Sequence, residues 1–393
     1  MSVTAAKGFV ANGVAAGIKD SGALDLSLVA TADGGTVPAA GVFTRNQVVA
    51  APVTVSGAHL TASGGRAAGV ILSSGNANAC TGDQGQTDAE TMCRLAAEGL
   101  GAPPAALLVC STGLIGPMLP MDRITAAIPG LVAGRTGEPA QATAAADAIL
   151  TTDTRRKQTV VRRAGFVVGG MAKGAAMLAP NMATMLAVLT TDAVADTGTL
   201  QQALAAGVAD SFNSMTIDGC TSTNDTVLLL ASGASSADGT PSDPGLLAEA
   251  VAEACLDLAM QMVGDAEGHT KVVRVRVTGA WTDADARQAA RKVAESQLVK
   301  CSWYGRDPYW GRVASDLGTA GVALDTAALT IAYGGVVVSR GCVGVDHDEQ
   351  AVAEHMAGEY LELHCDLGVG NGSARILTND LTHAYVDENM GTS

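Results

Sequence analysis

Aromatic side chains are scarce in this sequence, and this scarcity limits how a core can be built. Phe, Trp and Tyr make up 3% of the chain, whereas hydrophobic residues make up 48% and glycine occurs 47 times in 393 residues. A core with few rings must be filled by Ala, Val, Leu and Met, and glycines allow backbone segments to approach closely. A chain of this length folds as one large domain or as two fused domains.

Charge and hydropathy exclude several classes of protein. Only 16% of residues are charged, and the formal net charge is −15. A disordered chain would be more charged and less apolar, and a nucleic-acid-binding protein would need a basic face. The sequence has neither a run of about 18 uncharged apolar residues nor an N-terminal signal segment. We therefore expect a cytoplasmic protein that binds neither nucleic acid nor a membrane.

The residues that could bind a metal do not have metal-site spacing. The eight cysteines are widely spaced and form no C-x-x-C pair, which favours buried free thiols over disulfides or a zinc site. The segments 346–348 (Asp-His-Asp) and 364–366 (His-Cys-Asp) lack the helical i, i+4 spacing of a ligand pair. We expect no metal.

Short strands and helices alternate along the chain without regular β-α-β spacing. Val273, Val275 and Val277 alternate with arginines, which predicts a half-buried strand. The apolar runs 329–333 and 336–338 flank two glycines, which predicts a hairpin. Helices are predicted from a capping box at Thr87 to Gly99 or Gly101, and over 138–148, 244–264, 283–295 and 348–359. This order favours sheets packed on each other and flanked by helices.

One threonine has surroundings that suit an N-terminal nucleophile. Thr184 follows Pro180 and the small Ala183 and lies among apolar side chains. A threonine hydroxyl is a weak nucleophile without a neighbouring base, but a threonine that begins a chain has its own α-amine, with a pKa of about 7.7–8.0. Cleavage between Ala183 and Thr184 would create that amine. Taken alone, such a threonine is far more often a buried structural residue whose hydroxyl is bonded to backbone.

Other motifs occur along the chain in a fixed order. They are Lys7-Gly-Phe9, Gly13-Val-Ala-Ala-Gly-Ile18, Ser74-Gly-Asn-Ala-Asn-Ala-Cys80-Thr-Gly82, Ser111-Thr-Gly113-Leu-Ile-Gly116, Thr151-Thr-Asp-Thr154, Ser222-Thr-Asn-Asp-Thr226, Gly264-Asp-Ala-Glu267-Gly268, Asp307-Pro-Tyr-Trp310-Gly-Arg312 and Asp380-Leu-Thr-His-Ala-Tyr385-Val386. With the segment around Thr184, they resemble the ornithine acetyltransferase (ArgJ) family of arginine biosynthesis over essentially the whole chain.

The resemblance implies a fold and a division of the chain. The implied fold is an α/β αββα sandwich, two stacked sheets flanked by helices, with a smaller C-terminal α/β domain from about residue 280. Self-cleavage at Ala183–Thr184 would give an α chain of residues 1–183 and a β chain of residues 184–393. Two copies of each fragment would assemble as α2β2. No metal or organic cofactor is implied.

The resemblance also implies a reaction. Thr184 would take the acetyl group of N2-acetyl-L-ornithine and pass it to L-glutamate, in two half-reactions through a covalent intermediate. Bifunctional members also acetylate glutamate from acetyl-CoA as a co-substrate, and some relatives act in secondary metabolism; the motifs do not separate these roles. The family's oxyanion-hole residues match Thr112 and Gly113. A glycine leaves its N–H approachable, and a threonine offers a hydroxyl.

The family's substrate contacts map onto both halves of the chain. Lys173 suits the carboxylate of the substrate, and Glu267 suits the δ-ammonium of ornithine. The implied set is Thr151 or Thr152, Lys173, Thr184, Glu267, Asn389, and Thr392 or Ser393.

Two other functions remain open from the sequence. In an N-terminal-nucleophile aminopeptidase or amidohydrolase, water would replace the amine acceptor. An uncleaved amino-acid-binding protein would use the same pocket without chemistry. A dry pocket with charges of both signs favours transfer over hydrolysis.

Overall fold

The computed structural model describes residues 2–177 and 185–391, so Ala183, Thr184, Thr392 and Ser393 lie outside the described part. The chain forms two compact units. Unit 1 comprises Met1–Asn213 and Cys220–Met262, and unit 2 comprises Ser214–Gly219 and Val263–Ser393. Unit 1 has two sheets and unit 2 has one, and each unit has its own hydrophobic core.

Unit 1 contains two sheets, and each sheet includes one parallel pair of strands. The four-stranded sheet has the order β1-β2-β5-β6, with β5 and β6 parallel. The six-stranded sheet has the order β4-β3-β10-β9-β8-β7, with β9 and β10 parallel. The strands are β1 (Phe9–Val14), β2 (Leu26–Thr31), β3 (Val37–Phe43), β4 (Arg66–Ala67), β5 (Gly69–Asn76), β6 (Leu107–Leu114), β7 (Lys157–Arg163), β8 (Phe166–Lys173), β9 (Leu186–Thr191) and β10 (Thr226–Ala231).

The two sheets stack face to face because alternate side chains of both enter one core. Val70 and Leu72 of β5 pack in a cluster with Val188 of β9 and Leu228 of β10. The intervening Ile71 instead joins a second cluster under the helices. Both faces of β5 are therefore buried, which explains its nearly continuous apolar run.

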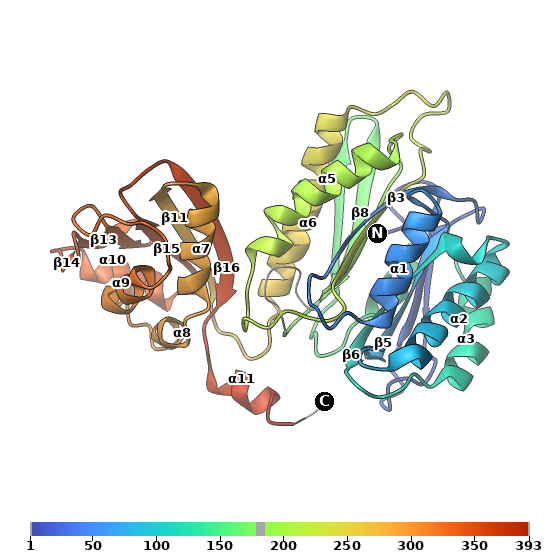
Figure 1. The fold of residues 1–393 in the computed structure, drawn as a ribbon, viewed down its shortest axis with the longest axis horizontal. Coiled ribbons are helices and arrows are strands. Elements are labelled where there is room, and N and C mark those ends of the chain that lie inside the picture. Colours follow the sequence, from blue (N-terminus) through green and yellow to red (C-terminus); the bar gives the residue numbers. More distant parts are fainter. Residues whose placement is uncertain (1, 178–184, 392–393) are drawn as a thin grey trace. The chain divides into compact units, whose positions relative to one another are not determined.

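Helices cover both outer faces, as Figure 1 shows. The four-stranded sheet is covered by α1 (Ala51–Ala62), α2 (Gly82–Leu100) and α3 (Met121–Ala133). The six-stranded sheet is covered by α5 (Thr197–Ala209) and α6 (Pro244–Val263). The short helix α4 (Pro139–Asp147) packs on β1, where a Cβ on Gly13 would lie only 2.1 Å from the carbonyl oxygen of Ala144. The predicted αββα sandwich and the predicted close backbone approach are both confirmed.

Unit 2 is a single mixed sheet with helices packed on it. Its strand order is β14-β13-β12-β15-β11-β16. The core contains two of the chain's few aromatic residues, Trp303 and Tyr333, both fully buried. The elements are β11 (Val272–Ala280), α7 (Asp283–Ala294), α8 (Gln297–Tyr304), α9 (Trp310–Gly318), β12 (Thr330–Tyr333), β13 (Val336–Arg340), β14 (Val343–Gly344), α10 (Glu349–Ala357), β15 (Tyr360–Asp366), β16 (Gly372–Asn379) and α11 (His383–Glu388).

Two local predictions are wrong. The capping box at Thr87 does not begin a helix, because α2 already begins at Gly82 and the Thr87 hydroxyl donates back to the carbonyl of Asp83. The helix does end at Gly101, whose φ of +72° is left-handed. Four of the eight cysteines are exposed rather than buried: Cys80, Cys220, Cys301 and Cys342.

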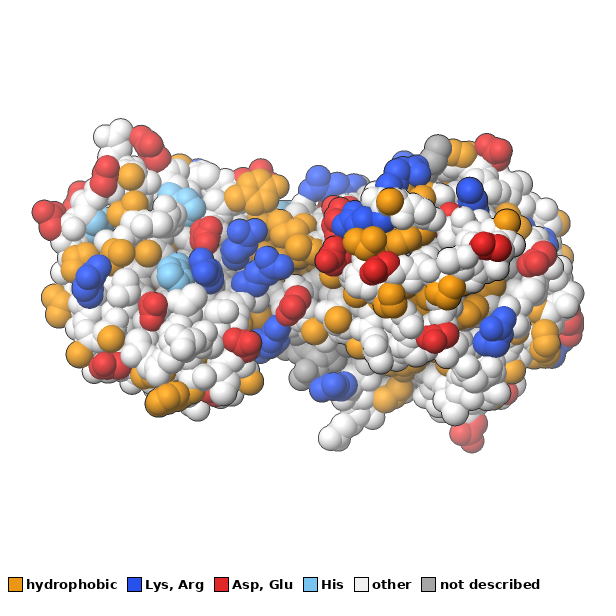
Figure 2. All heavy atoms as spheres, turned by 90° about the horizontal axis from the view of Figure 1, so that it is seen from above, with side chains coloured by type: hydrophobic (Ala, Val, Ile, Leu, Met, Phe, Trp, Pro, Cys, Tyr) orange, Lys and Arg blue, Asp and Glu red, His pale blue; other side chains and the backbone are white. Residues whose placement is uncertain are grey.

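The described surface carries charges of both signs. Figure 2 shows Lys and Arg side chains in small groups, separated by acidic and uncharged ones, on the face that it displays. Within the described ranges, every helix is too short or too polar to cross a bilayer.

Candidate active site

A buried lysine connects the two sheets of unit 1. Lys173 is the last residue of β8 and is only 2% exposed. Its Nζ donates to the hydroxyl of Thr151 at 2.7 Å and to the hydroxyl of Thr112, near the end of β6, at 3.3 Å. An ammonium group can only donate, so the Thr112 oxygen accepts from Lys173 and its own proton must point elsewhere. That proton is available to a ligand.

Asp153 is the counter-ion of this lysine and of a second one. Its carboxylate lies 3.7 Å from Lys173 Nζ and accepts a 2.6 Å hydrogen bond from Lys157 Nζ, with all three side chains buried. It also accepts from the backbone N–H groups of Thr151 and Gly174. Burial acts to raise the pKa of Asp153, but the charges of Lys173 and Lys157 and these hydrogen bonds hold it well below its usual range. The carboxylate is therefore ionised.

The backbone beside Thr112 turns sharply at a glycine. Gly113 has a φ of +131°, and a Cβ there would lie 2.3 Å from the carbonyl carbon of Gly75. The register of β5 and β6 shifts at this point, opposite Asn76. Only glycine fits such a conformation and such an approach. The segment 112–113, where the resemblance implies an oxyanion hole, is called the oxyanion turn below.

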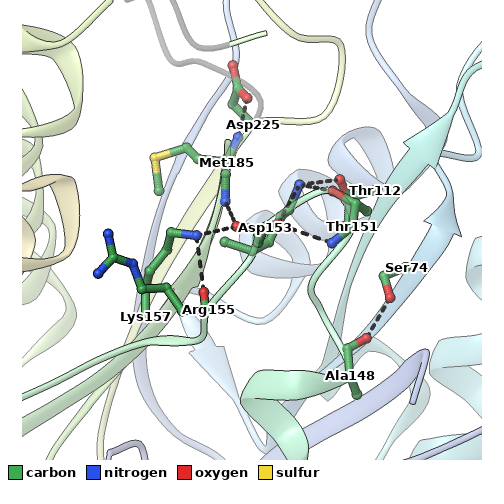
Figure 3. A network of polar contacts seen from close by, with 11 residues as sticks. Ser74, Thr112, Ala148, Thr151, Asp153, Arg155, Lys157, Met185 and Asp225 are labelled. Atoms are coloured by element: carbon green, nitrogen blue, oxygen red, sulfur yellow. Dashed lines mark hydrogen bonds and ion pairs between the residues drawn. The ribbon is translucent and has the colours of Figure 1, made fainter. Parts of the chain in front are cut away.

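Asn224 and Asp225, directly before β10, form hydrogen bonds with backbone groups of other segments of unit 1. The Asn224 amide donates to the carbonyls of Ala77, at 2.5 Å, and of Ser111, at 2.9 Å. The Asp225 carboxyl accepts from the N–H of Met185 at 2.9 Å, as Figure 3 shows. Met185 is the first described residue after the proposed nucleophile.

Unit 2 contains the other predicted substrate contacts. Asn389 donates from Nδ2 to Glu267 Oε2 at 2.8 Å and to the carbonyl of Tyr385 at 2.9 Å. Glu267 is 9% exposed and lines a cavity of about 130 Å³, together with Asp218, Asp380, Lys300 and others. Its lining includes carboxylates and the ammonium group of Lys300, so side chains of both charge signs face the cavity.

The predicted residues thus form two groups. Thr112, Gly113, Thr151 and Lys173 lie together in unit 1. Glu267 and Asn389 lie together in unit 2. Thr152 is exposed, unlike Thr151 with its bond to Lys173. The described residues contain no group of three or more His, Cys, Asp or Glu that could hold a metal ion.

Three polar residues of the site were missed by sequence analysis. Asp153, Asn224 and Asp225 occur inside quoted motifs but received no role. Their positions could have pointed to them, because each is a polar residue shortly before a strand. A polar side chain that is buried there needs a hydrogen-bond partner.

An αββα sandwich with a buried lysine and threonine hydroxyls between its sheets fits the class of acyl-transfer enzymes that the resemblance implied. The ArgJ family model matches residues 10–391. The arginine biosynthesis bifunctional protein ArgJ of Streptomyces avermitilis is 48% identical over 396 residues and covers 100% of both chains. The protein of the same name from Mycobacterium tuberculosis H37Rv is 48% identical over 397 residues, which is 100% of this chain and 96% of the relative.

Solved structures are also similar. An ornithine acetyltransferase from Mycobacterium tuberculosis, in complex with ornithine, is 46% identical over 46% of this chain and 94% of that chain, with a TM-score of 0.44. The chain belongs to the ArgJ family. The family prediction is confirmed, and with it the predicted enzyme class, an acetyltransferase of arginine biosynthesis.

Proposed function

We propose that this chain cleaves itself and then transfers acetyl groups from N2-acetyl-L-ornithine to L-glutamate, with Thr184 as the nucleophile. The observation that carries the proposal is the bond from Lys173 to Thr112. It frees the Thr112 proton for a developing oxyanion beside Gly113. Family membership supports the same reaction.

Self-cleavage needs no group from outside the chain except water. The Thr184 hydroxyl adds to the carbonyl carbon of Ala183, and the C–N bond then breaks while the nitrogen takes up the hydroxyl proton. The resulting ester is hydrolysed by water, which leaves a carboxylate on Ala183 and a free amine and hydroxyl on Thr184. The products are the α chain, residues 1–183, and the β chain, residues 184–393.

Acetyl transfer repeats the same chemistry on a substrate. The α-amine of Thr184 takes the hydroxyl proton as the oxygen attacks the acetyl carbonyl, and that proton passes to the leaving α-nitrogen of ornithine. The amine of glutamate then attacks the acetyl ester, and the Thr184 oxygen recovers a proton. Thr112 and Gly113 stabilise the oxyanion in both steps, and removing one such donor typically costs about 3 kcal/mol.

Substrate recognition needs charges of both signs. We assign the substrate carboxylate to Lys173 and the δ-ammonium of ornithine to Glu267, which Asn389 holds by a hydrogen bond. Thr151 or Thr152, and Thr392 or Ser393, supply further polar contacts. Acetyl-CoA is a co-substrate if the chain shares the bifunctional activity in its relatives' names.

The fragments and their location complete the proposal. The α and β chains stay together and assemble as α2β2, and we take unit 2, which begins at Val263 rather than at about residue 280, as the smaller C-terminal domain. The enzyme acts in the cytoplasm on small molecules.

The test is isotope exchange without glutamate. Because the acetyl-enzyme forms before the acceptor binds, purified protein should move label from free ornithine into N-acetylornithine. Release of acetate without exchange would instead show a hydrolase, and neither reaction would show a binding protein. A Thr184→Ala variant should remain one chain and catalyse no exchange.

A further inference from the structure

Two consecutive side chains reach the two backbone segments that matter most for the proposed chemistry. Asn224 is 4% exposed and Asp225 is fully buried. Both Asn224 amide hydrogens are used, one on the carbonyl of Ala77 and one on that of Ser111. Its Oδ1 accepts from the Thr223 hydroxyl, so the orientation of the amide is fixed. Asp225 Oδ1 accepts from the N–H of Met185.

The bonded peptides are the neighbours of the reacting groups. The Ser111 carbonyl belongs to the peptide that leads into Thr112, at the start of the oxyanion turn. The Met185 nitrogen belongs to the peptide whose carbonyl carbon is that of residue 184. The parallel register of β9 and β10, in which Leu186 lies opposite Thr226, keeps this arrangement in place.

We propose that Asn224 and Asp225 are positioning residues that fix the oxyanion turn and the start of the β chain relative to each other. This inference rests on the proposed function, because it assumes that residue 184 carries the nucleophile. Reacting atoms must be held at about 3–3.5 Å, and a misplacement of about 1 Å can cost on the order of 10²-fold in rate. A rigid link between the two segments is therefore worth much of the catalytic rate.

The two oxygens of the Asp225 carboxyl group have different surroundings. Its Oδ2 is buried and has no hydrogen-bond partner within residues 2–177 and 185–391. Burial raises the pKa of Asp225 well above its usual range, although the Met185 N–H, the Ser222 hydroxyl and the Lys173 charge act in the opposite direction. The atom that accepts from the Met185 N–H is Oδ1, at 2.9 Å. Asparagine can replace this acceptor and leucine cannot.

The experiment compares Asp225→Asn, Asp225→Leu and Asn224→Leu in the full chain. Self-cleavage is followed by intact mass, and kcat and KM for N-acetylornithine are measured on whatever protein matures. Asp225→Leu and Asn224→Leu should each slow cleavage and lower kcat by about 10²-fold while KM stays within about threefold. Asp225→Asn should stay within about tenfold of the unchanged protein. Asp225→Ser, which is too short to reach Met185, replaces Asp225→Leu if the latter does not fold.

A matched control is available at the far end of β9, the strand that Met185 precedes. Asp192 follows β9 at its other end, is 3% exposed, and also accepts from backbone N–H groups, those of Val167 and Lys7. Asp192→Leu should lower the melting temperature but leave the kcat of the folded protein within about threefold.

Three results would overturn the inference: Asp225→Leu cleaving at the normal rate, Asp225→Asn being as slow as Asp225→Leu, or Asp192→Leu losing as much kcat. If the unchanged protein neither cleaves nor exchanges label, the proposed function itself fails. If it does both and the variants match it, only the positioning role fails.

Discussion

Both units contain buried lysines, and two of them, Lys173 in unit 1 and Lys300 in unit 2, have different partners. Lys173 of unit 1 lies 3.7 Å from the carboxylate of Asp153, which also binds Lys157. Lys300 of unit 2 donates instead to neutral oxygens, the carbonyl of Ile217 at 2.6 Å and the hydroxyl of Thr378 at 3.2 Å. The first lysine has a carboxylate as its direct partner, and the second has none among these bonds.

The difference shows what a direct counter-ion does. Burial lowers the pKa of Lys300 to about 8, although Asp218, Asp380 and Glu295 nearby act to raise it. In unit 1, the ionised Asp153 sits between two ammonium groups and remains charged far into acid. Two ammonium groups beside a buried carboxylate therefore keep that carboxylate charged, whereas a buried lysine bonded to neutral oxygens titrates near pH 8.

Removing the shared counter-ion should have the largest effect. Asp153→Asn leaves two buried lysines without their carboxylate, so the free energy of unfolding should fall by about 3–5 kcal/mol. Urea unfolding followed by circular dichroism measures the loss. The control is Asp147→Asn, which breaks the more exposed ion pair with Arg156 and should cost no more than about 1 kcal/mol. Equal losses for the two variants would refute the counter-ion role of Asp153.

A smaller effect should appear as a pH dependence of unit 2. Between about pH 8 and 10.5 the unfolded chain keeps the Lys300 proton while the folded chain has lost it, so stability rises with pH. The unfolding free energy of the unchanged protein minus that of Lys300→Met should increase by up to about 3 kcal/mol across this window. Below pH 8 both states bind the proton, and the difference should be flat.

Tryptophan fluorescence can be used to follow the unfolding of unit 2. All three tryptophans, Trp281, Trp303 and Trp310, belong to unit 2. Lys292→Met removes an exposed lysine from α7 and serves as the control. A difference between the unchanged protein and Lys300→Met that falls as pH rises would contradict the assignment.

Much of the fold could be predicted because its signals are local. Thr282 and Asp348 accept from backbone N–H groups at the starts of α7 and α10, where the sequence predicted helices. The hairpin of β12 and β13 followed from two glycines between apolar runs. The first turn of α2 was missed because residues 82–86 are polar or glycine, so apolar periodicity begins only later.

The site could be predicted only in part because its contacts are long-range. The bond from Lys173 to Thr112 joins residues 61 positions apart on two different sheets, and no local pattern encodes it. The motif resemblance supplied both residues. Asp153 and Asp225 received no role because a carboxylate becomes informative only when its burial and partners are known.

The central claim is that Thr184 becomes an N-terminal, acetyl-accepting residue, and intact-mass analysis tests it most directly. The purified protein should consist of two fragments that divide after Ala183. N-acetylornithine should add the mass of one acetyl group to the β fragment alone, and glutamate should remove it. An undivided chain, an acetyl group on the α fragment, or an acetyl group that glutamate does not discharge would contradict the account.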